Sequence, residues 1–153
     1  DIPLLIKGVM TAEDAIIACD LGVDGVWVSN HGGRQLDQAQ GALAVLPEIV
    51  DAMEDRAAVI VDGGFLRGTD VIKAIALGAD VVGLGRLTAM GLGAGGEEGL
   101  TRAMDLLAEE MQIAMGLLGL TRLDQLGPEC LTTAPAVDSP DVLSAFPLLD
   151  PNR

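Results

Sequence analysis

Residues 4–30 read LLIKGVMTAEDAIIACDLGVDGVWVSN, in which an apolar run of strand length, a stretch of helical period and a second apolar run follow one another. Residues 60–86 repeat this order, align with residues 4–30 without a gap, and are identical to them at eight positions. A strand, a helix and a second strand in this order are typical of a parallel α/β sheet, and their repetition indicates copies of one unit. The sequence therefore predicts an α/β fold built from repeated βα units.

Four such units are predicted along the chain. Strands are expected at four nearly continuous apolar runs, Pro3–Gly8, Gly25–Asn30, Ala58–Gly63 and Val81–Gly85, as is usual where both faces of a sheet are covered. Helices are expected to follow them at Thr11–Leu21, Pro47–Asp55, Thr69–Leu77 and Glu98–Leu118. The 153 residues are too few for a complete (β/α)8 barrel, which needs about 250. The two duplicated segments are each interpreted as one quarter of a barrel.

Composition and charge exclude several classes of protein. The chain is 50% hydrophobic and has a formal net charge of −14, which disfavours binding to nucleic acid or to an anionic membrane surface. Charged residues interrupt every apolar run before the roughly 18 residues of a membrane span, so no transmembrane segment is expected. Cys19 and Cys130 lack metal-ligand spacing, so we expect no metal site and a reducing, cytoplasmic location. The chain starts at Asp1, and we expect it to be a fragment that lacks an upstream portion.

The candidate functional residues follow the predicted strands. Functional groups of parallel α/β proteins collect where strands end and loops begin. Lys7 ends the first predicted strand, and His31 and Arg34 follow the second. An ammonium at a strand end needs a negative charge or hydrogen-bond acceptors, an imidazole is a base near neutral pH, and a guanidinium suits a carboxylate. We therefore expect a charged rim with catalytic potential, although each residue also has a purely structural interpretation.

Glycine-rich loops follow the third and fourth predicted strands. These loops carry Asp62-Gly63-Gly64 and Gly83-Leu84-Gly85-Arg86. Glycine lets backbone amides approach a ligand closely, and the loops after the last two strands of a barrel often bind phosphate. Glycine also serves ordinary tight turns. The pairing of two such loops with a terminal arginine favours a phosphate site.

Taken together, these motifs resemble the family of FMN-dependent α-hydroxy-acid dehydrogenases and oxidases. The resemblance runs over residues 1–131 and rests on PLLIKGV at 3–9, SNHGGRQLD at 29–37, DGG at 62–64 with RGTD at 67–70, and GR at 85–86. It implies the C-terminal half, strands five to eight, of a (β/α)8 TIM barrel in residues 1–127, followed by an extension in residues 128–153. It also implies FMN as cofactor and oxidation of a 2-hydroxy acid to the 2-oxo acid.

The resemblance assigns a role to each candidate residue. Lys7 is expected beside the N1 and O2 atoms of the flavin, and Ser29 is expected to contact the flavin. His31 is implied as the catalytic base and Arg34 as the residue that binds the substrate carboxylate. The residues implied to cradle the ribityl phosphate are Asp62, Gly63, Gly64, Gly85 and Arg86, and Arg67 is a further implied cofactor-binding residue.

The sequence departs from the family pattern in three respects. Leu66 stands where many members have the first of two arginines, and Leu87 replaces a proline. The four upstream strands, which carry further flavin contacts and an aspartate that orients the histidine, are missing from the sequence. We therefore expect the isolated chain to be nearly inactive, and the full-length protein to be a homo-oligomer. Alternatives are another FMN barrel, such as a type 2 isopentenyl-diphosphate isomerase or an IMP-dehydrogenase-like protein, or a non-enzymatic half-barrel that binds phosphate or associates with itself.

Overall fold

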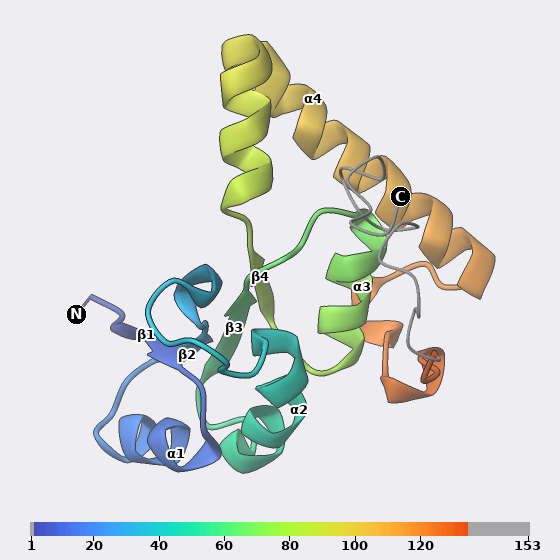
Figure 1. The fold of residues 1–153 in the computed structure, drawn as a ribbon. Coiled ribbons are helices and arrows are strands. Elements are labelled where there is room, and N and C mark those ends of the chain that lie inside the picture. The colour runs from blue at the N-terminus through green and yellow to red at the C-terminus, as the bar shows by residue number, and fades with distance from the viewer. Residues whose placement is uncertain (1, 135–153) are drawn as a thin grey trace, which may run out of the picture.

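The computed structural model describes residues 2–134, in which four parallel strands alternate with four helices (Figure 1). The strands are β1 (Leu5–Val9), β2 (Gly25–Val28), β3 (Ala58–Asp62) and β4 (Val81–Gly83). The helices are α1 (Ala12–Asp20), α2 (Ala42–Met53), α3 (Gly68–Ala76) and α4 (Arg86–Leu118). Short 3-10 turns cover His31–Gly33, Leu123–Gln125 and Pro128–Cys130. This order confirms the predicted α/β fold of repeated βα units.

The sheet has one face covered by helices. Its strands pair in the order β1-β2-β3-β4, all in parallel. Because side chains alternate between the faces of a strand, the register places Val26 and Val28 beside Val59 and Val61 on one face. These four valines are at most 4% exposed, and they share a core with helix residues that include Ala15, Ala18, Leu46 and Ile49. The hydrophobic core therefore lies between the sheet and its helices.

The opposite face of the sheet leads to the functional residues. The register aligns Lys7, Trp27, Ile60 and Val81 in one row across the four strands, and Leu5 lies on the same face. Leu5 and Val81, which belong to the two edge strands, are 45% and 49% exposed. This face is thus apolar at the edges of the sheet and carries a cation near its carboxyl end.

The internal duplication predicted from the sequence is present in the structure. Helices α1 and α3 begin at Ala12 and Gly68, which are equivalent positions of the two aligned copies. Asp24 and Asp80 are also equivalent, and each carboxylate accepts from a main-chain N–H near the start of the neighbouring strand. The donor is Leu4 at 2.7 Å in the first copy and Val59 at 2.8 Å in the second, which is one position before the equivalent of Leu4. In both places the aspartate therefore ties the start of one strand to the start of the next.

The strands are shorter than the apolar runs that predicted them. β1 begins at Leu5 rather than at Pro3, which has no N–H to give to a sheet. β2 ends at Val28 rather than at Asn30, and β4 ends at Gly83 rather than at Gly85. The residues that drop out at the carboxyl ends of β2 and β4 enter the loops there, and Ser29 and Gly85 among them contribute to the site described below.

The predicted start of the second helix at Pro47 is wrong. Helix α2 begins at Ala42, and Pro47 lies inside it. Proline favours the first turn because it lacks an N–H, which is why the sequence indicated a later start. Helix α2 continues through Pro47 because Leu46, Ile49 and Met53 form a buried face with at most 1% exposure. Such packing outweighs local helix propensity.

The predicted helix Glu98–Leu118 is present as the second arm of α4, and the sequence missed the first arm. Helical structure already begins at Arg86, and α4 reverses direction at Gly95 and Gly96, where the backbone is not helical. Figure 1 shows the resulting two arms of α4 meeting at a tip. The arms approach closely at Gly91 and Gly99, where an added Cβ on Gly99 would collide with the carbonyl of Gly91. The first arm is rich in glycine, a poor helix former, so its sequence did not predict a helix.

The C-terminal extension predicted for residues 128–153 lies largely outside the described part of the chain, which ends at residue 134. Its first residues form the 3-10 turn Pro128–Cys130. Among the helices of residues 2–134, none has both the length and the apolar character of a membrane span.

Candidate active site

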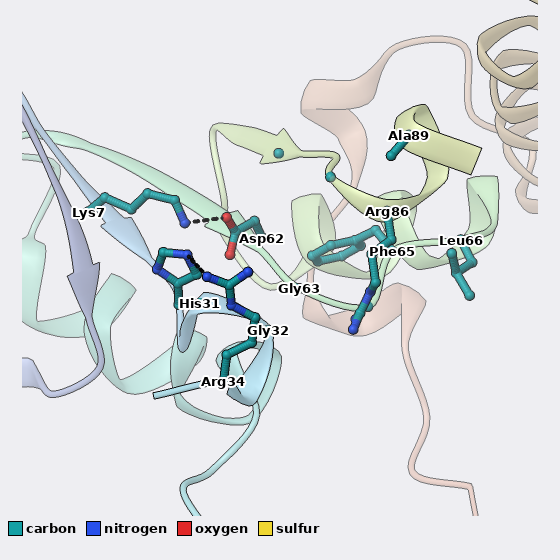
Figure 2. A pocket seen from close by; sticks show the side chains of 13 residues that line it. Lys7, His31, Gly32, Arg34, Asp62, Gly63, Phe65, Leu66, Arg86 and Ala89 are labelled. Atoms are coloured by element: carbon teal, nitrogen blue, oxygen red, sulfur yellow. Dashed lines mark hydrogen bonds and ion pairs between the residues drawn. The ribbon is translucent and has the colours of Figure 1, made fainter. Parts of the chain in front are cut away.

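A cavity of about 380 Å³ lies at the carboxyl ends of the strands, and Figure 2 shows the side chains that point toward it. Eight of the ten residues singled out from the sequence line it: Lys7, His31, Arg34, Asp62, Gly63, Gly64, Gly85 and Arg86. Parallel strands bring their carboxyl ends to one edge of a sheet, which explains why residues as distant in sequence as Lys7 and Arg86 meet here.

Lys7 and Asp62 form an ion pair at the edge of the cavity. Lys7 Nζ lies 2.6 Å from Asp62 Oδ2 and 2.7 Å from Ser29 Oγ. The side chain of Asp62 is only 19% exposed and that of Lys7 is 42% exposed. The largely buried carboxylate thus meets a cation, as a buried charge requires, and the three residues join β1, β3 and the loop after β2.

Ser29 lies behind the cavity rather than on its wall. It is 2% exposed, and its Oγ accepts hydrogen bonds from Lys7 Nζ at 2.7 Å and from the main-chain N–H of His31 at 3.2 Å. One buried hydroxyl therefore sets the positions of both the ammonium and the loop that carries the imidazole.

His31 and Arg34 lie together on the 3-10 turn after β2. The turn is capped by Asn30, whose Oδ1 accepts from the N–H of Gly33 at 3.1 Å and whose Nδ2 donates to the carbonyl of Gln40 at 3.2 Å. The cap holds His31 at a φ of 56°, a conformation that residues other than glycine rarely adopt and that clusters at functional sites. A strained histidine therefore lies at the mouth of the cavity.

The side chains of His31 and Arg34 contact each other. Arg34 Nη2 lies 3.4 Å from His31 Nε2, and Figure 2 shows the two side chains pointing toward each other. A guanidinium has only N–H donors, so a hydrogen bond between the two side chains is donated by Arg34. The imidazole and the guanidinium border the same cavity, where a titratable group and a carboxylate-binding cation can both reach one ligand.

The opposite wall of the cavity is formed mainly by backbone. Gly63 and Gly64 have φ values of 99° and 88°, a region that side chains rarely tolerate. Gly85 caps the start of α4 without a side-chain hydrogen bond, and Arg86 is the first residue of that helix. The first N–H groups of a helix have no acceptor within it and favour anions. This wall can therefore hold a phosphate between free amides and a guanidinium.

Arg67 does not reach the cavity. Its Nε lies 2.7 Å from Glu110 Oε1, and the other carboxylate oxygen of Glu110 accepts from the N–H of Gly68 at 2.7 Å. Glu110 belongs to α4, so this pair holds the start of α3 against the long helix. No sequence signal pointed to Glu110, because its partners are distant along the chain.

Sequence reasoning also missed three residues around the cavity. Phe65 and Ala89 line it, as does Leu66, which the sequence had marked as a departure from the family pattern. Trp27 lies with its ring centroid 4.9 Å from Lys7 Nζ. Phe65 follows the two glycines directly, a position that signals proximity to their loop. Trp27 is the residue of β2 that pairs with Lys7 of β1. The alternation of side chains along each predicted strand does not reveal this pairing, because the register between the two strands is not known from the sequence.

Comparisons with known proteins identify relatives of this arrangement. A model of the FMN-dependent dehydrogenase family matches residues 1–133. A peroxisomal (S)-2-hydroxyacid oxidase of Arabidopsis thaliana is 48% identical over 126 residues, covering 82% of this chain and 35% of the relative. An L-lactate dehydrogenase of Caulobacter vibrioides is 52% identical over 118 residues, covering 77% of this chain and 31% of the relative.

Solved structures of mandelate oxidase have a similar fold. A variant with (S)-mandelic acid has a TM-score of 0.83 and 44% identity, covering 90% of this chain and 40% of that one. A variant with a monooxide FMN adduct has a TM-score of 0.79 and 47% identity, covering 81% of this chain and 40% of that one. The chain thus spans about a third of the two curated relatives, with 35% and 31% of their lengths covered. Because one relative is named as peroxisomal, the cytoplasmic location stays a prediction.

Proposed function

Since this chain belongs to the family of FMN-dependent dehydrogenases, we propose that it carries the part of an active site that oxidises a 2-hydroxy acid to the 2-oxo acid with FMN. One observation supports this proposal above the others. A base, a carboxylate-binding cation and a second cation, namely His31, Arg34 and Lys7, border the same cavity. This combination of groups matches the chemistry of removing two electrons and a proton from a carboxylate-bearing alcohol.

The cavity has features that fit FMN. An added Cβ on Gly64 or Gly85 would meet no atom within 4 Å, so the backbone there borders open space that a phosphate and its ribityl chain can occupy. Arg86 and the start of α4 supply positive charge at the same place. We propose that Gly63, Gly64, Gly85 and Arg86 hold the phosphate end, and that Lys7 lies beside the flavin ring with Ser29 and Asp62 behind it.

In the proposed reaction, Arg34 binds the substrate carboxylate through its planar guanidinium. The imidazole of His31 accepts a proton from the hydroxy acid. When bound, FMN would supply the acceptor for the two electrons and for the second of the two hydrogens that the substrate loses. The substrate loses one C–H and one O–H bond and gains a carbon–oxygen double bond. Lys7 lies where its charge stabilises the negative charge that accumulates at the cofactor.

We further propose how the chain fits into a complete protein. Residues 1–127 would form strands five to eight of a (β/α)8 barrel, and residues 128–153 an extension. Leu5 and Val81, on the two edge strands, are exposed. They support a further set of βα units beside these strands, because unpaired strand edges and apolar surface favour association. A homo-oligomer of the full-length protein remains a prediction. The family match makes a non-enzymatic half-barrel the less favoured interpretation.

The proposed function is tested by anaerobic mixing with substrate. Residues 1–133 would replace the matching stretch of the Caulobacter vibrioides L-lactate dehydrogenase, and the FMN-loaded chimera would be mixed with a panel of 2-hydroxy acids. We expect at least one of them to bleach the flavin absorbance, and we expect the isolated chain with added FMN to show almost no bleaching. A chimera that folds and binds FMN but is bleached by none of the acids would contradict the proposal.

The two arginines near the glycine loop provide a matched pair of variants for the phosphate site. Arg86→Ala is expected to weaken FMN binding by about tenfold, because it removes a charged hydrogen-bonding group from an anion. Arg67→Ala is expected to change it less than twofold (about 0.4 kcal/mol or less), since Arg67 pairs with Glu110. The measurement is the dissociation constant from quenching of flavin fluorescence. The reverse order of effects would show that Arg67, as the family pattern implies, is the phosphate ligand.

A further inference from the structure

The ammonium of Lys7 is held from three directions. Two of them are hydrogen bonds, to Asp62 Oδ2 at 2.6 Å and to Ser29 Oγ at 2.7 Å. The third is the ring face of Trp27, whose centroid lies 4.9 Å from Nζ. An ammonium within about 6 Å of an indole face is attracted by the ring quadrupole. The indole therefore helps to fix the position of the Lys7 ammonium, together with the two hydrogen-bond acceptors Asp62 and Ser29.

The position of the Trp27 ring depends on a glycine two strands away. A Cβ added to Gly83 on β4 would lie 2.8 Å from Cζ2 of Trp27 and 3.4 Å from Cε2. Trp27 is on β2, so its ring extends across β3 and rests on the bare backbone of Gly83. Any side chain at position 83 would push the ring away from this place. The glycine thus has a packing role that its loop motif did not reveal.

The indole N–H of Trp27 does not hold the ring in place. Nε1 is buried and has no hydrogen-bond partner among residues 2–134. A buried donor without an acceptor is unfavourable, so the ring is kept here by its packing and by the cation rather than by its N–H. A phenyl ring, which has a face but no N–H, should then serve in its place.

We propose that Trp27 is a positioning residue for Lys7: its ring, seated on Gly83, holds the ammonium toward the cavity. This inference deepens the proposed function, because the cavity edge where Lys7 stands is where we place the flavin ring. The ring face of Trp27 then determines how closely the positive charge approaches reduced FMN. The contact between the Trp27 ring and the Lys7 ammonium does not itself depend on the cofactor.

The first test needs no cofactor and contains its own reference. The chain has only two lysines, Lys7 and Lys73, and the side chain of Lys73 on α3 is 53% exposed. Limited acetylation of the full chain, followed by peptide mass spectrometry, measures the labelling of Lys7 relative to Lys73. We expect Trp27→Leu to raise this ratio by about threefold, the effect of losing one weak cation–π contact, and Trp27→Phe to leave it near the wild-type value.

A second variant distinguishes the loss of the ring contact from misfolding of Trp27→Leu. Gly83→Ala keeps the tryptophan but displaces its ring, and it should raise the labelling of Lys7 as Trp27→Leu does. Far-ultraviolet circular dichroism selects variants that retain the wild-type helix content. Equal labelling ratios in wild type and in both folded variants, or a Trp27→Phe ratio as high as that of Trp27→Leu, would overturn the inference.

A separate titration tests the link to FMN. Oxidised and reduced FMN are each titrated into the full chain, the reduced form under anaerobic conditions. Trp27→Leu is expected to weaken binding of reduced FMN about threefold more than binding of oxidised FMN, and Trp27→Phe to restore the ratio. Equal weakening of both forms would mean that Trp27 only packs. Failure of the wild-type chain to bind either form would contradict the cofactor part of the proposed function, while the labelling result would still decide the role of Trp27.

Discussion

Replacing His31 with glutamine is expected to slow the reduction of FMN by a 2-hydroxy acid by about a thousandfold. A positioned general base contributes on the order of 10²- to 10⁴-fold to a rate. Glutamine preserves the size and polarity of the side chain, and its amide cannot accept the proton that we propose the imidazole of His31 takes. The loss should therefore fall on the rate of flavin reduction at saturating substrate, with little change in FMN binding.

The measurement is stopped-flow absorbance of the flavin in the chimera described above. Lys73→Gln is the matched control, because it removes a side chain that is 53% exposed on α3 and is expected to leave the rate unchanged. A His31→Gln variant that binds FMN and retains more than about a tenth of the wild-type rate would exclude His31 as the base. Unchanged FMN affinity in the same variant rules out a collapse of the cavity as the cause.

Replacing Gly68 with alanine is expected to lower the free energy of unfolding by about 2 kcal/mol, a typical cost of forcing extra atoms into a packed contact. Gly68 is the first residue of α3, and its Cα approaches the backbone of α4. An added Cβ would lie 2.6 Å from the carbonyl oxygen of Leu107 and 2.6 Å from the nitrogen of Met111. Backbone atoms cannot rotate away as a flexible side chain can, so the two helices would have to separate.

The same substitution at Gly116 is the control. Gly116 lies inside α4, and an added Cβ there would meet no atom within 4 Å. Alanine is a better helix former than glycine by roughly 0.8–1 kcal/mol, so Gly116→Ala is expected to raise the free energy of unfolding. Urea denaturation followed by circular dichroism measures both variants. Equal effects, or a stable Gly68→Ala variant, would show that α3 and α4 are not in this close contact.

Local sequence was sufficient to predict most of the fold. The repeat of residues 4–30 in residues 60–86 located α1 and α3, and the apolar runs located all four strands with only small errors at their ends. The misplaced start of the second helix at Pro47 and the missed first arm of α4 have one cause. In both, local propensity disfavoured a helix that packing stabilises: a buried face in α2, and the close approach of the two arms in α4.

Most of the candidate site was also readable from the sequence, because parallel strands bring their carboxyl ends together whatever lies between them. Eight of the ten predicted residues line one cavity. Arg67 is the residue whose environment the sequence did not reveal, since its partner Glu110 comes from a helix that packs beside α3 only in the folded chain.

The sequence by itself determined the order of strands and helices, the family, and the residue types at the cavity, because each of these depends on spacing along the chain. Only the tertiary structure decided which charges are paired. Lys7 on β1 meets Asp62 on β3, and Trp27 on β2 reaches Gly83 on β4. Such contacts follow from strand register and from the direction in which each side chain leaves its strand. These are properties of the packed sheet, because they arise only when neighbouring strands have settled against one another.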